Sequence, residues 1–225
     1  MDVTGSISAG EDFDYYQSRL RVLLILHFFS KPYHDELKPS RKSIFETEVK
    51  IQKIDFLLRY PDYLAYEILS LVNEGELQKS SEIKDVVSHI FKAKEPVIRK
   101  QEMERFFFGA YEDLADIIAF LQAFGFVEYE SEKSASGKNI GKKYFVTEFG
   151  EERIKRGILE VSAVSWYAER CQLIREYFGE LSGSDLKVRQ YQIRKYKDTP
   201  LNQHIDSIEE ETKEMYLNIY KEALV

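Results

Sequence analysis

The stretch that most constrains the fold of this chain is 126–147, where two β-branched and aromatic runs flank a polar connector. FVEYE precedes the connector SEKSASGKNIGK, and KYFVT follows it. Because the connector is rich in Ser, Gly and Lys and too long for a tight turn, it predicts a solvated loop between two strands. Tyr144 and Val146 would share one strand face and meet Val127 and Tyr129 across the hairpin.

Helices are expected on both sides of this hairpin. YEDLADIIAFLQAF precedes it, with a predicted apolar face of Leu114, Ile117, Ile118, Leu121 and Phe124. Gly125 provides a left-handed stop for that helix, and the Thr147 hydroxyl can cap the next one. Apolar residues at spacings of three and four predict that this next helix runs unbroken over 151–180, roughly 36 Å long.

The order helix, strand, charged loop, strand and helix is typical of the C-terminal half of a winged-helix domain. The run YFVTEFGEERI is similar to the Tyr-x-Leu-Thr-x-x-Gly run that closes the hairpin in many winged-helix regulators, with Val146 in place of Leu. The predicted fold is therefore mainly α: a helical N-terminal region, a winged-helix module with a β-hairpin, and long C-terminal helices. Such a fold says little about function by itself.

Proline positions and polar stretches suggest how the chain is organised. Small polar residues open it, a polar loop is expected between Pro32 and Pro39, and Pro61 separates two amphipathic helices. The predicted regions are a flexible tail (1–13), a helical region (14–95), the winged-helix module (96–150) and C-terminal helices (151–225).

The charge distribution leaves two uses of the winged helix open. The net charge is −7, and residues 128–143 carry four lysines against three glutamates. A wing that neutralises several phosphates needs more positive charge, and acidic Glu112, Asp113 and Asp116 surround the expected recognition helix. Protein docking is thus favoured over direct DNA reading. Possible nucleic-acid or partner contacts are Lys138, Lys142 and Lys143 near the wing, and Lys187, Arg189, Arg194, Lys195 and Lys197 in a basic segment that can equally be a solvated face.

Patterns that resemble reactive sites lack the context that their chemistry needs. SGKNIGKK has a misplaced first Gly for a phosphate-binding loop, and Lys143 stands where Ser or Thr would bind magnesium. Pro61-Asp62 and Glu82-Ile83-Lys84 match a nuclease pattern in letters, but no adjacent buried strands are expected to bring the acids to one metal ion. The four histidines have no metal-ligand spacing. We therefore predict no enzyme, no catalytic residue, no metal site and no cofactor.

Other sequence features favour a cytoplasmic location. Cys171 is the one cysteine and lies on an apolar helical face, so no internal disulfide can form. The longest apolar run, VLLILHFF, is far shorter than the roughly 20 residues that span a bilayer. We expect no membrane association.

Two longer phrases resemble a bacterial defence family. EVKIQKIDFLLRYPDYL and VIRKQEMERFFFGAYEDLADIIAFLQAFGFVEYE resemble the small middle component of ABC-three-component systems, to which the Lamassu group of anti-phage and anti-plasmid defences belongs. The second phrase departs from the family at 110–112, where Gly-Pro-Trp-Asp would be typical. The residues that carry the match include Lys50, Lys53, Asp55, Arg59, Tyr60 and Arg105.

This resemblance implies a non-catalytic adaptor. Its partners would be a coiled-coil ATPase related to chromosome-maintenance proteins and an effector, often a nuclease, with at most weak or indirect DNA contact. The alternative is a winged-helix transcriptional regulator that binds DNA by itself, and a third, weaker interpretation is a nuclease that uses Asp62.

Overall fold

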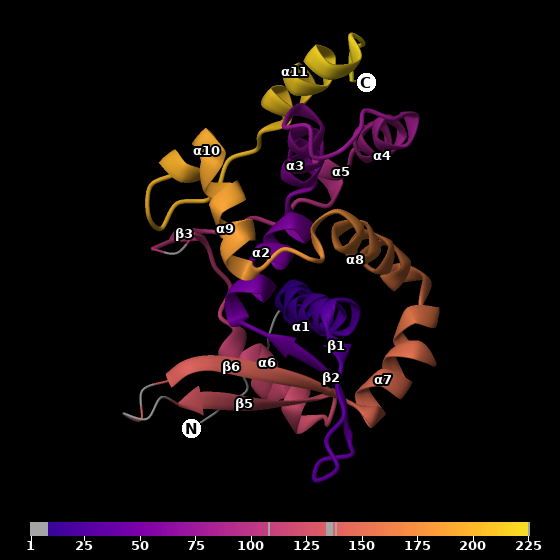
Figure 1. The fold of residues 1–225 in the computed structure, drawn as a ribbon, viewed down its shortest axis with the longest axis vertical. Helices are drawn as coiled ribbons and strands as arrows, with labels where there is room; N and C mark the ends of the chain where they lie inside the picture. The colour runs from indigo at the N-terminus through magenta and orange to yellow at the C-terminus, as the bar shows by residue number, and fades with distance from the viewer. Residues whose placement is uncertain (1–8, 108, 134–136, 138, 225) are drawn as a thin grey trace. The chain divides into compact units, whose positions relative to one another are not determined.

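A computed structural model describes residues 9–107, 109–133, 137 and 139–224 (Figure 1). It is mainly helical with small antiparallel sheets, which confirms the predicted fold class. The chain forms two compact units: unit 1 is Met1–Ile51 with Asp113–Gln172, and unit 2 is Gln52–Glu112 with Leu173–Val225. Each unit thus joins two separated stretches, whereas the sequence suggested consecutive regions. No helix in the described ranges has the length and apolar character needed to cross a bilayer.

Unit 1 contains a four-stranded antiparallel sheet in the order β1-β2-β6-β5, with helices around it. Its elements are α1 (Ala9–Phe29), β1 (Lys31–Pro32), β2 (Arg41–Glu46), the start of α2 (Glu48–Arg59), α6 (Leu114–Ala123), β5 (Val127–Lys133), β6 (Asn139–Thr147), α7 (Glu148–Lys155), the 3-10 turns Ile158–Glu160 and Ser162–Val164, and the start of α8 (Ser165–Phe178).

The predicted hairpin is present in the predicted register. Val127 lies opposite Val146 and Tyr129 opposite Tyr144, and both residues of β6 are buried. The strand β2 was not predicted, since 31–43 suggested a polar loop; it pairs with β6, with Ile44 opposite Phe145. Helix α1, strand β2, helix α2, then α6 and the β5–β6 hairpin follow the chain order of a winged helix. The Gln52–Glu112 stretch of unit 2 falls within that order.

In the run YFVTEFG, which closes the hairpin, Thr147 and Gly150 make the contacts that fix the local structure. The Thr147 hydroxyl donates to the carbonyl of Gly125 (2.6 Å) and accepts from the amide of Gly150 (2.9 Å), so it caps α7 as predicted. A Cβ on Gly150 would lie 2.3 Å from the carbonyl oxygen of Phe126. The motif therefore ties the end of α6 to the start of α7 at the base of the hairpin.

We expect Gly150→Ala to destabilise the protein by about 1–3 kcal/mol, because the added methyl group meets rigid backbone. In an ordinary helix the same change would stabilise. Chemical denaturation measures the difference. Gly141→Ala is the matched control, since its Cβ would approach only the flexible carboxylate of Glu132, at 3.3 Å. Equal stability of the two variants would contradict this account of the motif.

The predicted continuous helix over 151–180 is wrong. α7 ends at Lys155, two 3-10 turns follow, and α8 starts at Ser165. Val161 has extended backbone angles and is 51% exposed, although Ile154 and Ile174 on the predicted stripe are fully buried. The apolar spacing thus continues across a break in the helix, which begins at Arg156 and Gly157.

Unit 2 is built around α3, which packs against α4 and α11 (Figure 1). Its elements are the rest of α2, α3 (Pro61–Asn73), α4 (Ser81–Lys92), α5 (Glu95–Ile98), β3 (Arg105–Phe106), β4 (Gly109–Ala110), the rest of α8, α9 (Gly183–Gln192), α10 (Arg194–Asp198) and α11 (Glu209–Tyr220). As predicted, α2 and α3 meet at Pro61. β3 and β4 pair as a short hairpin, where the triple Phe suggested a strand or tight turn.

Asp62 has a structural place in unit 2. It is buried, and its carboxylate accepts hydrogen bonds from the Ser207 hydroxyl and the Ile208 amide, both at 2.7 Å. Burial raises the pKa of Asp62, although these hydrogen bonds act in the opposite direction. Ile208 is the residue just before α11, so Asp62 joins the start of α3 to the start of α11. Glu82 of the nuclease-like pattern is exposed.

Candidate interaction surfaces

α6 lies where a winged helix places its recognition helix. Leu114, Ile117, Ile118 and Leu121 are buried, and α6 packs against α1. The outward face offers Asp116, alanines, Gln122 and the half-buried Phe120, and the helix contains no Lys or Arg. Phe124 was predicted in the buried face but is 59% exposed, because it is the C-cap residue beyond the last turn. This helix therefore presents small and aromatic side chains instead of cations.

Aromatic rings extend from α6 to its neighbours in unit 1. The ring centroids of Phe120 and Phe124 lie 4.6 Å apart, and Tyr15 and Tyr16 of α1 lie 6.0 and 6.3 Å from Phe120. On the other side of Gly125, Phe149 of α7 is also exposed. We call Tyr15, Tyr16, Phe120, Phe124 and Phe149 the aromatic ridge.

A buried arginine supports the ridge from below. The Arg19 guanidinium lies 3.1 Å from the Tyr15 ring centroid and 5.1 Å from that of Phe120, and it donates to the Tyr15 carbonyl (2.7 Å). Arg19 is only 7% exposed, and its guanidinium interacts with the rings of Tyr15 and Phe120. The ridge is thus held in place but offers no exposed cation from this residue.

The predicted lysine contacts beside the wing already form ion pairs within the protein. Lys142 pairs with Glu48 (2.6 Å) and Lys143 with Glu132 (2.5 Å). The hydrogen bond to Glu132 raises the pKa of Lys143. Lys138, the third predicted contact, lies outside the described residues.

The neighbouring acids of β5 are also engaged. Arg41 bridges Glu128 and Glu130, each at 2.7 Å, and stacks on Phe145, and Lys38 also pairs with Glu130. Hydrogen bonds from Lys38 and Arg41 lower the pKa of Glu130. This face of the sheet is a network of matched charges, which leaves little positive potential for a polyanion.

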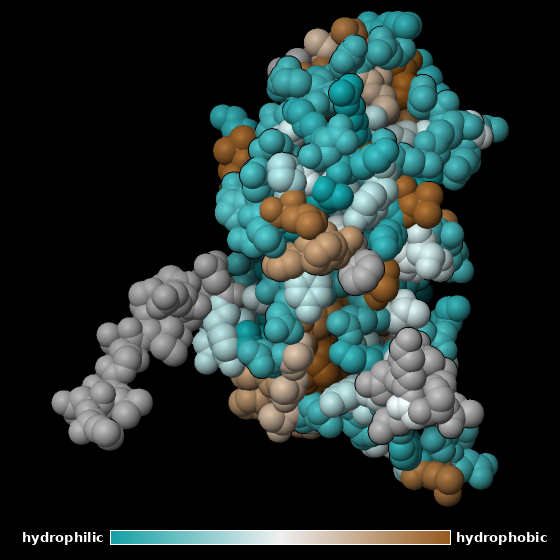
Figure 2. All heavy atoms as spheres, turned by 90° about the vertical axis from the view of Figure 1, so that its left-hand side faces the viewer, coloured by the Kyte–Doolittle hydropathy of each residue, from teal (hydrophilic) through white to brown (hydrophobic). Residues whose placement is uncertain are grey.

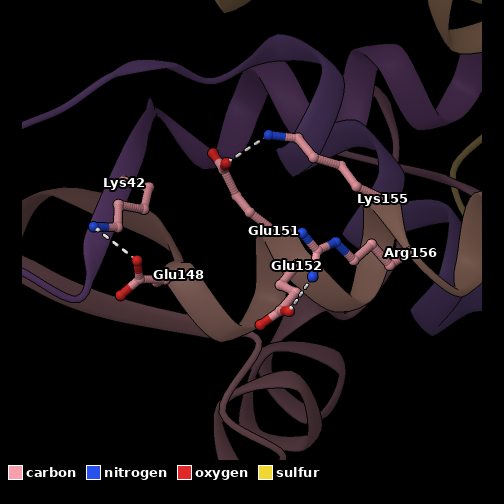
Figure 3. Close-up of a pocket in the computed structure, with 6 residues that line it drawn as sticks. All are labelled: Lys42, Glu148, Glu151, Glu152, Lys155 and Arg156. Carbon is pink, nitrogen blue, oxygen red and sulfur yellow. Dashed lines mark hydrogen bonds and ion pairs between the residues drawn. The ribbon is translucent and has the colours of Figure 1, made fainter.

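A surface groove beside α7 is likewise neutral. Its lining residues are Lys42, Glu148, Glu151, Glu152, Lys155 and Arg156. Figure 3 shows each cation reaching one carboxylate: Lys42–Glu148 at 3.3 Å, Lys155–Glu151 at 2.8 Å and Arg156–Glu152 at 3.0 Å. The charges cancel and the side chains are largely solvated, so the groove holds no buried reactive group.

The predicted basic segment 187–197 in unit 2 is mostly paired as well. Arg189 reaches the buried carboxylate of Glu67 (2.9 Å) and that of Glu74 (3.0 Å). Burial raises the pKa of Glu67 to about 7, while Arg189 opposes the rise. The remaining predicted contacts are placed as follows: Arg194 with Asp198 (3.2 Å), Lys195 with Glu211 (2.9 Å), Lys187 over the Tyr191 ring (5.8 Å), and Lys197 exposed.

All the motif residues named for the two resembling phrases except Lys50 lie in unit 2. Lys53 is buried, and its ammonium lies 3.3 Å from the Tyr196 hydroxyl, which accepts the Ala110 amide hydrogen (2.8 Å). Burial, helped by Lys187, lowers the pKa of Lys53 to about 8. Gly109 has φ +101°, and a Cβ there would lie 2.2 Å from the same hydroxyl.

Arg59 and Tyr60 of α2 hold the loop before this contact. Arg59 donates to the carbonyls of Gln101 (3.1 Å) and Glu102, and it pairs with Glu112. The Tyr60 hydroxyl accepts the Met103 amide hydrogen (2.9 Å). Residues of the first phrase thus hold the backbone of the second phrase in place through hydrogen bonds. The spacing of residues within either phrase could not predict these contacts.

The remaining motif residues are also within the fold. Asp55 is fully buried, 3.6 Å from Arg59. Arg105 donates to the carbonyl of Thr199. Lys50 is half-buried in the first turn of α2. Gln52 also belongs to the first phrase, and its side-chain amide exchanges two hydrogen bonds with the backbone of Glu112, at 2.6 and 2.8 Å.

Within the described residues, no group of three or more His, Cys, Asp or Glu side chains is arranged to hold a metal ion. On the face drawn in Figure 2, hydrophobic residues form separate patches among hydrophilic ones. Comparisons with protein-family models, with curated proteins and with solved structures each found no match, so the family suggested by the two phrases stays a prediction.

Proposed function

We propose that this chain is a non-catalytic adaptor that links a coiled-coil, chromosome-maintenance-like ATPase to an effector nuclease in a bacterial anti-phage or anti-plasmid complex. One observation carries the docking part of this proposal: the helix in the recognition position presents aromatic side chains and no cation. The identity of the partners rests on the resemblance of the two phrases in 48–130.

The electrostatics of unit 1 argue against duplex DNA as the ligand of the winged helix. Tight duplex binding needs several Lys or Arg side chains, because neutralisation of phosphates by these cations releases condensed counterions. α6 contributes Asp116 and Gln122 instead, and the described wing-side cations already pair with glutamates. A duplex would have to break those pairs and bring phosphates towards acids.

The aromatic ridge has the composition of a protein-binding surface. Tyr and Phe provide large contact areas at low cost in side-chain entropy, and exposed aromatic clusters often mark partner sites. The alanines of α6 allow close approach of another helix. Because the exposed Asp116 lies one turn before Phe120 on α6, we expect the partner to combine apolar residues with Lys or Arg.

We expect Tyr16→Ser with Phe124→Ser to weaken binding of one partner at least ~30-fold, since both side chains are 59% exposed and both rings lie against the ring of Phe120. The measurement is biolayer interferometry with the purified products of the two genes that flank this one. Leu37→Ser is the control, because Leu37 is a 91% exposed apolar residue of the same unit away from the ridge.

DNA binding provides the opposing test. The rival regulator would bind a 20-base-pair duplex tightly at 50 mM salt and lose affinity when Lys142 and Lys143 are both changed to Glu. We expect weak binding, unaffected by that change, in fluorescence anisotropy. Nanomolar, salt-sensitive binding that disappears in the Lys→Glu variant would refute the protein-docking proposal for this helix.

A further inference from the structure

We infer that the outer edge of β5 (Val127–Lys133) takes an extended segment of a partner protein as an additional strand of the unit 1 sheet. This inference rests on the proposed adaptor function and deepens it, because it names the kind of segment that a partner contributes. In the sheet order β1-β2-β6-β5, β5 is an outermost strand, and within the described residues only β6 pairs with it (Figure 1). An outermost strand presents a row of unpaired backbone groups to another chain.

The pairing of β5 with β6 determines which backbone groups face outwards. The Thr147 amide donates to the carbonyl of Phe126 (3.1 Å), and the next pair along the strands is Val127 opposite Val146. In an antiparallel pair, residues whose peptide groups bond to the neighbouring strand alternate with residues whose peptide groups point away from it. The outward-facing peptide groups of β5 therefore belong to Val127, Tyr129 and Ser131.

Two of these three residues are accessible from solvent. Tyr129 is 41% exposed and Ser131 is also exposed, whereas Val127 is buried. β5 reads VEYESEK and contains no proline, so each of its residues has a backbone N–H. The other outermost strand, β1, consists of Lys31 and Pro32, and proline has no N–H to donate. β5 is thus the edge of this sheet that suits the addition of a strand.

A second copy of this chain is a poor occupant of the β5 edge. Two antiparallel copies centred on Tyr129 would place Glu128 opposite Glu130. A register centred on Ser131 would place Glu130 opposite Glu132. Like charges directly opposite each other destabilise a strand pair. The edge therefore favours an extended segment of a different protein.

The two faces of β5 indicate the chemistry of that segment. On one face Glu128 and Glu130 already pair with Arg41, so the partner needs no cation there, but an acidic residue would be repelled. On the other face Tyr129 is exposed, and aromatic and β-branched residues pair favourably with tyrosine across strands. We expect a proline-free segment with a β-branched or aromatic residue beside Tyr129 and no acid beside the glutamates.

Amide hydrogen exchange, followed residue by residue by NMR, tests the edge without any substitution. In the free chain the amides of Glu128 and Glu130 should exchange slowly because they face β6, and those of Tyr129 and Ser131 should exchange quickly. Saturation with the purified flanking-gene product that binds this chain should slow exchange at Tyr129 and Ser131 at least ~10-fold, because new hydrogen bonds form there. Unchanged exchange at both residues in the complex would refute the inference.

Ser131→Pro tests the same edge by affinity. The proline ring replaces an outward N–H and leaves the hydrogen bonds to β6 in place, so the melting temperature should change little. In biolayer interferometry with the full-length chain, we expect binding of that partner to weaken at least ~10-fold, because a hydrogen bond is lost and the ring blocks close approach. Ser131→Thr is the matched control, since it changes the side chain but retains the N–H, and its affinity should stay within about threefold of wild type.

The outcomes separate this inference from the function on which it rests. If wild type binds a flanking-gene product and Ser131→Pro binds it equally well, strand addition is refuted while the adaptor proposal stands. If wild type binds neither product, the adaptor proposal and this inference both fail. A dimer of this chain that Ser131→Pro converts to a monomer would identify a second copy as the occupant and overturn the choice of a partner protein.

Discussion

Gly109→Ala is expected to be among the most damaging single substitutions, with a loss of about 2–5 kcal/mol in the free energy of unfolding. The residue has φ +101°, which side chains rarely adopt, and the added Cβ would lie 2.2 Å from the Tyr196 hydroxyl and 2.8 Å from the Lys53 ammonium. Tyr196 and Lys53 are both buried, so neither can move without disturbing unit 2. Urea denaturation measures the loss.

Two further variants separate the causes. Gly75→Ala has a similar left-handed backbone (φ +79°) with nothing within 4 Å of its Cβ, so it reports backbone strain alone, about 1 kcal/mol. In Gly109→Ala with Tyr196→Phe, removal of the hydroxyl relieves the shortest contact of the added Cβ, while that with Lys53 at 2.8 Å remains. The combined loss should therefore be smaller than the sum of the single losses. Strict additivity, or equal effects of Gly75→Ala and Gly109→Ala, would contradict the proposed contact.

Arg189→Met is expected to destabilise the protein by about 3–5 kcal/mol at pH 8.5, because it leaves the buried Glu67 carboxylate without its partner. The side chains of Arg189 and Glu67 are only 12% and 5% exposed. Burial already raises the pKa of Glu67 to about 7 in the presence of Arg189, and loss of the guanidinium must raise it further.

The sign of the pH dependence follows from that raised pKa. A carboxyl whose folded pKa exceeds its unfolded value contributes stability below the unfolded pKa of about 4.5, and this contribution is lost as pH rises through about 7. In Arg189→Met the loss is larger, so its difference from wild type should grow between pH 5 and pH 8.5. Arg194→Met, which removes an exposed pair with Asp198, should cost little at either pH. A difference for Arg189→Met that does not change with pH would exclude this role of Glu67.

Local sequence signals predicted the parts of unit 1 that depend on neighbouring residues. The register of Val127 with Val146 follows from the two-residue alternation of the strands, and the Thr147 cap follows from its place before α7. Gly125 ends α6 with φ +75°, as its position suggested. These features are encoded within a few residues, so they can be read without knowledge of the rest of the fold.

Features that depend on distant residues were not predictable. In β2 the polar residues Arg41 and Ser43 are buried and few residues are apolar, so the sequence shows no apolar–polar alternation typical of a strand. Its pairing with β6 joins residues about a hundred positions apart in the sequence. The continuous helix over 151–180 was wrong because a three-and-four apolar pattern cannot tell one helix from two helices with a turn between them. The composition of each unit from two stretches has no local signal at all.

In the candidate surfaces, too, the sequence predicted local features but not contacts between distant residues. The sequence identified the basic segment and the lysines beside the wing, but their carboxylate partners, such as Glu67 for Arg189 and Glu48 for Lys142, are far along the chain. Motif residues including Lys53 and Tyr60 were visible only as letters in phrases that resemble a family. Their contacts with Tyr196 and Met103 give them a physical role, which is to fix the hairpin that carries Phe107.

The most direct test of the account is the mass of the assembly formed when this chain is mixed with the purified products of its two flanking genes. Size-exclusion chromatography with multi-angle light scattering measures that mass without any label. Our proposal predicts one species that contains all three chains, and a mixture that lacks this chain should leave the other two apart. A chain that elutes alone at its monomer mass of 26.5 kDa, beside partners that assemble without it, would contradict the central claim that it acts by joining them.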